Sequence, residues 1–292
     1  MRIHRFISSL ILVFLLTGTS VYGKVMPVEF DLGRNRLIAA MLRSQLSAQH
    51  FGHKSFDEQM SKEAYKLYLS QLDPKKQFLL ASDLIQLDQF ADKIDDEISH
   101  GRIALPDVGM KLLNNRVAEV TGLVKEIMDA GFSPDKKDYL ETDPDKLSAP
   151  ADRAELKDRW RRSLKMEVLH SYLDELDKEN KKREKEEQPL LDSESGQVDK
   201  KLWAEAIKEV RKKTDAYLAR LLKITRQEHY NRYFDAVARS FDPHTNYMAP
   251  TSKEDFDIHM SGSLEGIGAL LREDDGHIKV VRIIPGSAAE AQ

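Results

Sequence analysis

Hydrophobic residues recur at intervals of three and four over most of the chain, a spacing that places them on one face of an α-helix. A first helix is predicted from Arg34 to about Ala48. Its apolar stripe consists of Leu37, Met41, Leu42 and Leu46. A second helix is predicted from Lys62 to Leu72, with Ser61 as its N-cap and Asp73-Pro74 as its end.

The next two stripes predict longer helices. One helix has Ser82 as its N-cap and ends at Gly101, because glycine commonly follows a helix C-terminus. Its apolar positions are Leu84, Leu87, Phe90, Ile94 and Ile98. The other spans residues 106–130, with proline in its first turn and Gly131 just beyond its end. It carries a seam for packing against other helices, formed by Leu113, Val117, Val120, Val124 and Ile127.

Residues 133–150 contain three prolines and no periodicity, which predicts a surface loop. Helical spacing returns at Ala151, where apolar residues follow one another every four positions: Leu156, Trp160, Leu164, Val168 and Tyr172. The charged run DKENKKREKEE at 177–187 is either a solvated extension of that helix or a disordered tail. After the break QPLLDSESGQ, helical spacing resumes from Asp199 to about Phe241. This region includes Leu202, Ala206, Val210, Tyr217, Leu221, Phe234, Val237 and Phe241.

The pattern changes after residue 250, where glycines become frequent. A β-branched run, Ile278, Val280, Val281, Ile283 and Ile284, is ended by Pro285-Gly286 and predicts a strand. The predicted fold class is therefore mainly α. A large N-terminal helical domain over roughly residues 30–241 is followed by a short β-containing segment.

The first residues predict secretion. A basic start, MRIHR, precedes an apolar run from Phe6 to Leu16, and a small-residue pattern places cleavage after Gly23. The apolar run is shorter than the roughly 20 residues that a membrane span needs. We therefore expect the mature chain to begin at Lys24, to lie in the periplasm and to have no membrane span.

Composition excludes several kinds of site. The chain has no cysteine, so it has no disulfide, no thiolate metal site and no lipid attachment site at the cleavage point. Charged residues make up 32% of the chain, but the net charge is only -4, which implies no nucleic-acid partner. No cofactor is expected.

Two groups of residues have metal-ligand chemistry, but their context favours structural roles. His50 and His53 are three residues apart without a third ligand in view, which is a poor zinc signal. The carboxylates Asp92, Asp95, Asp96 and Glu97 fall on the polar face of a predicted helix, whereas calcium requires a turning loop.

The residue patterns that could indicate a catalytic site are also weak signals. A cluster at the end of the helical region lies on a turn-rich connector, where turn chemistry explains such residues as well as acid/base catalysis does. It contains Asp242, His244, Asp255, Asp257 and His259. The pairs Ser61-Lys62 and Ser252-Lys253 are adjacent, and adjacent residues do not face one another on a helix. No catalytic residue is predicted.

The glycines on both sides of Ile267 are more informative. Glycines ahead of an apolar run allow the backbone to turn and to present successive N–H groups to a carboxylate. Capture of a peptide C-terminus by backbone amides together with strand addition is one recognition mode of this kind. The alternative is a glycine-rich turn that only leads into a strand.

Several segments, taken in order and with their spacing, resemble the bacterial carboxy-terminal processing proteases, also called tail-specific proteases. They are LDPKKQFLLASDL, FDPHTNYMAP, SKEDFDIHMSGSLEGIGALL and IKVVRIIPGSAAE. The first lies in the part that looks like the family's N-terminal helical domain, and the others look like its junction and the start of its PDZ domain. After the signal peptide expected at 1–23, the resemblance implies a helical domain at 24–241, a connector at 242–260 and an incomplete PDZ domain at 261–292.

The resemblance also implies a function. Members of this family are periplasmic serine endopeptidases with a Ser-Lys dyad that recognise apolar C-terminal tails of proteins. By position, the loop that binds the tail's carboxylate comprises Leu264, Gly266, Ile267, Gly268 and Ala269. The dyad of the family lies in a protease core after the PDZ domain, so we expect this sequence to be inactive alone. We also expect the residues after about Ser261 to be poorly ordered unless they pack on the helices or on another chain.

Two alternatives remain open on the sequence. One is a non-catalytic periplasmic module that binds peptide tails or an adaptor protein. The other is a helical interaction protein that merely ends in a strand. The expected partners are protein substrates, bound through their tails, and an adaptor.

Overall fold

The computed structural model describes residues 30–191, 198–249, 268–274 and 277–290. They form eight α-helices, one short 3-10 helix and one β-hairpin within those ranges. In chain order the elements are α1 (Leu32–Gln49), α2 (Glu58–Leu72), α3 (Ala81–Asp88), α4 (Ile94–His100), α5 (Leu105–Ala130), η1 (Pro144–Lys146), α6 (Arg153–Lys185), α7 (Lys200–Leu221), α8 (Arg226–Phe241), β1 (Ala269–Asp274) and β2 (His277–Ile283). The predicted mainly α fold is confirmed.

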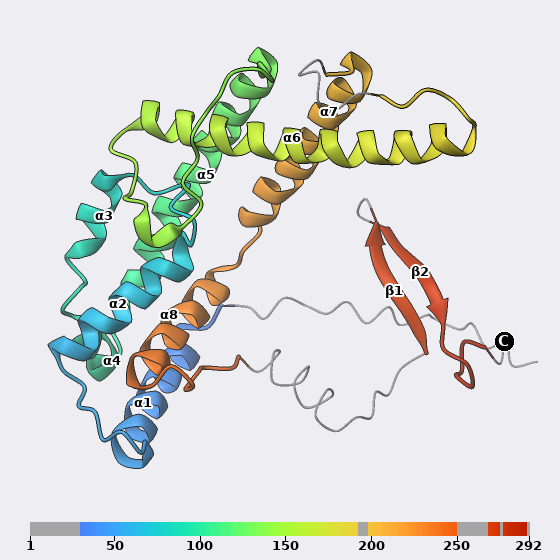
Figure 1. Ribbon diagram of the computed structural model, residues 1–292. Helices are drawn as coiled ribbons and strands as arrows, with labels where there is room; N and C mark the ends of the chain where they lie inside the picture. The colour runs from blue at the N-terminus through green and yellow to red at the C-terminus, as the bar shows by residue number, and fades with distance from the viewer. Residues whose placement is uncertain (1–29, 192–197, 250–267, 275–276, 291–292) are drawn as a thin grey trace, which may run out of the picture.

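Helix α5 joins two groups of helices. It contacts α3 and α8 on one side and α6 and α7 on the other, while α1, α2, α4 and α8 pack among themselves (Figure 1). A single apolar cluster extends from Ala39 to Phe241 across all of these helices. Among the described residues, no helix combines the length and apolarity that a membrane crossing requires.

The predicted stripes of α5 and α6 are confirmed. The five seam residues of α5 are buried, as are the five apolar residues of α6 that follow one another every four positions. The charged run after them is a solvated helix extension, since α6 continues to Lys185 with ion pairs one turn apart. Lys181 Nζ lies 2.6 Å from Asp177, and Arg183 Nε lies 3.0 Å from Glu179. The loop predicted at 133–150 is confirmed and contains only η1.

The predicted face of α1 is partly wrong. Leu37 and Met41 are 60% and 50% exposed, whereas Asn35 is fully buried. Asn35 Nδ2 donates to Gln227 Oε1 on α8, and Gln227 Nε2 donates back to Asn35 Oδ1, both at 2.9 Å. Because a buried amide must have its hydrogen-bonding groups satisfied, this pair sets the rotation of α1 against α8.

Two predicted helix starts are also wrong. Helix α2 begins four residues before Lys62, with Asp57 as its N-cap, because the Asp57 carboxylate accepts from Met60 N at 2.9 Å. Ser82, the predicted N-cap of the next helix, lies inside α3. That helix starts at Ala81 after Leu80 as its N-cap, and Leu80 N donates to the Asp83 carboxylate.

The stretch predicted as one helix up to Gly101 is divided into α3 and α4, although Gly101 does end α4 with a left-handed φ of 63°. The division has a tertiary cause. The Ser61 hydroxyl of α2 accepts from Asp95 N at 2.9 Å and donates to the Asp95 carboxylate at 2.7 Å, so it supplies the cap that starts α4. The region predicted from Asp199 is likewise divided, into α7 and α8, by a capping box between Thr225 and Glu228.

Candidate functional site

Gly268 is the first described residue of the predicted carboxylate loop. Its φ of 76° is left-handed, which side chains other than glycine seldom adopt. A Cβ placed there would lie 2.0 Å from Ser287 Cβ, so the backbone at Gly268 passes directly against that side chain. The Gly268 carbonyl accepts from Ile284 N at 2.7 Å and from Ser287 Oγ at 3.2 Å. Glycine is therefore required by the turn that leads into β1.

The following hairpin pairs β1 with β2 in antiparallel register. Ala269 lies opposite Ile283, and the register shifts between Leu270 and Leu271. Apolar side chains on the hairpin are between 44% and 55% exposed: Leu270, Leu271, Val280, Val281, Ile283 and Ile284. The strand predicted from the β-branched run is confirmed as β2. A two-stranded hairpin with so much exposed apolar surface requires a further packing partner to be stable.

The connector after α8 begins with a turn held by Asp242. The Asp242 carboxylate accepts from His244 N at 2.7 Å, and its carbonyl accepts from Thr245 N at 3.0 Å. Asp242 thus has the turn role that its sequence context predicts. His50, far away in sequence, holds the same turn, since its Nε2 lies 3.1 Å from Thr245 Oγ1.

The His50 ring is fully occupied by these contacts. Its Nδ1 accepts from Gly52 N at 3.1 Å, so the proton must lie on Nε2, which then donates to Thr245 Oγ1. This tautomer leaves neither nitrogen with a lone pair for a metal. His53 is exposed, and no group of three or more metal-binding side chains occurs in the described part of the chain.

Tyr247 and Asp235 form a second anchor for the connector. Tyr247 N donates to the Asp235 carboxylate at 3.1 Å, and the Tyr247 ring packs edge-on against Phe234 with ring centroids 5.5 Å apart. The same carboxylate accepts from Gln71 Nε2 at 2.9 Å and pairs with Arg239 at 2.8 Å. One half-buried acidic side chain on α8 therefore ties α2 and the connector together.

Several candidate residues lie outside the described residues. They are Leu264, Gly266 and Ile267 of the carboxylate loop, Asp255, Asp257 and His259 of the junction cluster, and the Ser252-Lys253 pair. The roles predicted for these residues therefore stay predictions. The same holds for the expectation that the chain is poorly ordered after about Ser261. Ser61 is described but engages Asp95 with both its donor and its acceptor, so it is not placed as a nucleophile.

The part of the chain that matches a known family is most of the helical domain together with the connector turn. The family profile described as the tail specific protease N-terminal domain matches residues 42–251, which is well over half of the sequence. The chain belongs to the tail-specific protease family. The matched region contains most of the helical domain and the connector turn that His50, Thr245 and Tyr247 hold in place.

Two curated relatives agree with this assignment. The tail-specific protease of Haemophilus influenzae is 25% identical over 261 residues, which is 88% of this chain and 33% of the relative. The carboxy-terminal processing protease CtpA of Bacillus subtilis is 47% identical over 49 residues, which is 17% of this chain and 10% of the relative. The sequence thus spans about a third of the length of the Haemophilus influenzae protein.

The tail-specific protease helical domain uses buried acidic residues that sequence patterns did not reveal. Glu97, predicted on a solvated face, is buried, and its Oε1 accepts from Ala104 N at 2.8 Å and from Leu105 N at 3.2 Å. Asp73 is also buried and accepts from the amides of three consecutive residues, 77–79, at 2.8–2.9 Å. Both carboxylates bind backbone N–H groups where a helix starts or ends. The signal available in the sequence is an acidic residue a few positions before an irregular apolar segment.

Proposed function

We propose that these residues are the N-terminal portion of a periplasmic serine endopeptidase that recognises apolar C-terminal tails of proteins. The observation that carries the proposal is the match of residues 42–251 to the tail-specific protease N-terminal domain. The basic-apolar start of the chain supports export, because a signal peptide has this pattern.

We further propose that the segment from Ser261 is the start of a PDZ domain. The Leu264-to-Ala269 stretch would bind a tail's carboxylate through backbone amides, with the tail added as a strand beside the hairpin. The left-handed backbone at Gly268 supports this role, since turns that contain a left-handed residue can direct successive amides toward an anion.

The helical domain then has a scaffolding role in the proposal. It would shape the enclosure around the PDZ domain and the protease core and would offer surface to an adaptor protein. No residue of the 292 is assigned to the Ser-Lys dyad. We expect these residues alone to lack peptide hydrolysis, because acyl transfer needs the nucleophile and its base.

The first test is the intact mass of the endogenous protein, captured from a periplasmic extract with an antibody against the helical domain. A species far above 33.4 kDa supports the protease proposal. A single species slightly below that mass, without peptidase activity, contradicts it and favours a non-catalytic binding protein.

The second test is degradation of a periplasmic reporter. A reporter ending in four apolar residues should disappear in cells that contain the gene and persist in cells that lack it. The same reporter with a charged tail is the control and should persist in both. Equal loss of the two reporters would contradict tail recognition.

A further inference from the structure

The loop at 133–140 lies along α6 and encloses a groove of about 750 Å³ that the proposed function does not use. The apolar part of its lining comes mainly from one face of α6. It consists of Leu140, Met166, Leu169, Tyr172, Leu173 and Val198. Leu173 is 51% exposed, so its side chain leaves apolar surface in the groove open to a ligand.

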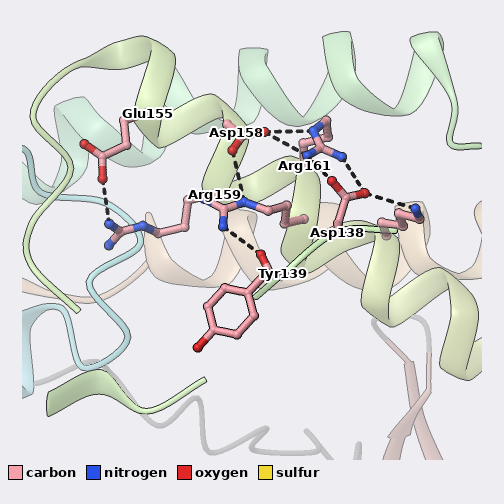
Figure 2. A network of polar contacts seen from close by, with 8 residues as sticks. Asp138, Tyr139, Glu155, Asp158, Arg159 and Arg161 are labelled. Carbon is pink, nitrogen blue, oxygen red and sulfur yellow. Dashed lines mark hydrogen bonds and ion pairs between the residues drawn. The ribbon is translucent and has the colours of Figure 1, made fainter. Parts of the chain in front are cut away.

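The loop is fixed to α6 by a polar network, so the groove is preformed (Figure 2). Arg161 donates to both oxygens of Asp138, at 2.8 and 3.1 Å, and Lys165 lies 3.0 Å from the same carboxylate. Lys165 also donates to the Lys136 carbonyl, and Arg162 donates to the Tyr139 carbonyl at 2.7 Å. The Arg161 guanidinium, followed by Lys165, holds the pKa of Asp138 well below its usual range. A groove fixed in this way spends little free energy on ordering when a ligand binds.

The groove is locally positive on a protein whose net charge is -4. Its lining contains four cationic side chains, Lys136, Lys137, Arg162 and Lys165, and two carboxylates, Asp135 and Asp138, while Arg162 also pairs with Asp158 at 3.0 Å. Asp138 is neutralised by Arg161 and Lys165. The ammonium groups of Lys136 and Lys137 have no ion pair within the described residues, and both side chains are exposed. The groove therefore favours a ligand that carries negative charge.

The charges and the apolar surface are arranged along one direction. The Lys136 carbonyl accepts from Lys165, and Arg162 lies one turn before Lys165 on α6, whereas Leu169 and Leu173 follow one and two turns after it. Eight residues of helix correspond to about 12 Å, which matches roughly four residues of extended chain. A ligand that fits has one anionic end and a short apolar stretch before it. The end of an apolar polypeptide has this form.

We infer that this groove binds the last residues of an apolar protein tail, with the terminal carboxylate against Lys136 and Lys137. The inference rests on the proposed recognition of apolar tails and adds a second tail-binding site, on the helical domain. An incoming substrate would then contact the helical domain as well as the loop at Gly268.

The inference is tested with a fluorescein-labelled peptide that ends in four apolar residues, titrated with the full 292-residue chain by fluorescence anisotropy. The double variant Lys136→Ala/Lys137→Ala should bind at least tenfold more weakly, and amidation of the peptide's C-terminus should have a similar effect. Leu173→Asp should also weaken binding. The double variant Lys181→Ala/Lys182→Ala makes the same charge change further along α6 and should bind within twofold of the parent.

A photo-crosslinking peptide of the same sequence locates the contact. Crosslinks to residues 134–173 support the inference. Crosslinks confined to the region around Gly268, unaffected by the Lys136/Lys137 variant, overturn the groove but leave the proposed tail recognition standing. Equal binding of the amidated peptide also overturns the inference, because the groove would then take internal segments. Loss of tail dependence in the reporter assay as well would overturn the proposed function itself.

Discussion

His229 is the most unusual single side chain in the helical domain. It is fully buried in α8, and neither ring nitrogen has a hydrogen-bond partner within the described residues. Burial, together with the nearby Arg232, lowers the pKa of His229 from 6.5 to about 4. The imidazole is therefore neutral in the folded protein at neutral pH.

This shift predicts a pH-dependent stability. Between pH 6.5 and about 4 the unfolded chain binds one more proton at His229 than the folded chain does. The free energy of unfolding should therefore fall as pH falls through this window, by an amount on the order of 3 kcal/mol in total. Urea denaturation from pH 7 to 4.5 measures it, and His229→Leu should flatten the dependence by up to about 1.4 kcal/mol per pH unit.

The matched control for His229 is His170→Leu, because His170 is exposed on α6. This variant should keep the pH slope of the parent. If His229→Leu and the parent show the same slope, then His229 titrates normally in the folded state and the argument from burial is wrong.

At the scale of the element, the turn that leads into β1 depends on contact as well as on backbone conformation. Gly268 and Gly286 both have left-handed φ values, 76° and 77°. A Cβ at Gly286 meets nothing within 4 Å, whereas one at Gly268 overlaps Ser287. Replacing Gly286 by alanine therefore tests the cost of the left-handed backbone alone. Replacing Gly268 by alanine adds the cost of the overlap with Ser287.

We expect Gly286→Ala to destabilise the hairpin by about 1 kcal/mol, the usual cost of a left-handed alanine. Gly268→Ala should cost clearly more and should expose the Ile284 amide, which donates to the Gly268 carbonyl. Amide hydrogen exchange at Ile284 reports the difference. Ser287→Gly in the Gly268→Ala background should restore part of the protection, and equal effects of the two alanine variants would contradict the steric account.

At the scale of the whole molecule, the core of the helical domain is continuous and lies within residues 39–241. Tyr247 closes its edge by packing on Phe234. A chain cut after Ala249 retains every buried residue of this cluster and both connector anchors. It should therefore fold as one cooperative unit.

We expect removal of residues 250–292 to change the melting temperature by less than about 2 °C, since a change of 1 kcal/mol in a domain of this size shifts the midpoint by a few degrees. Circular dichroism at the helical band measures this. As a matched control, Tyr247→Ala in the same shortened chain should lower the midpoint by several degrees. A large drop caused by the truncation alone would mean that the C-terminal part packs on the helices.

The sequence by itself determined the secondary-structure class, the apolar seams of α5 and α6 and the strand β2. These features follow from local spacing, because one helix face or one β-branched run is enough to specify them. It also determined the family, because LDPKKQFLLASDL, FDPHTNYMAP and SGSLEGIGALL are specific short segments, and the match over residues 42–251 agrees with them.

Tertiary structure alone decided where several helices begin and which way they face. The local pattern predicts Ser61 as the N-cap of its own helix, yet it caps α4 across a separation of 34 residues. The rotation of α1 depends on Asn35 and Gln227, which are 192 residues apart. The groove beside α6 forms where the loop is tied to that helix, with Asp138 paired to Arg161 and Lys165. Such contacts join distant residues through polar groups that must be satisfied when buried, and periodicity along the chain does not encode them.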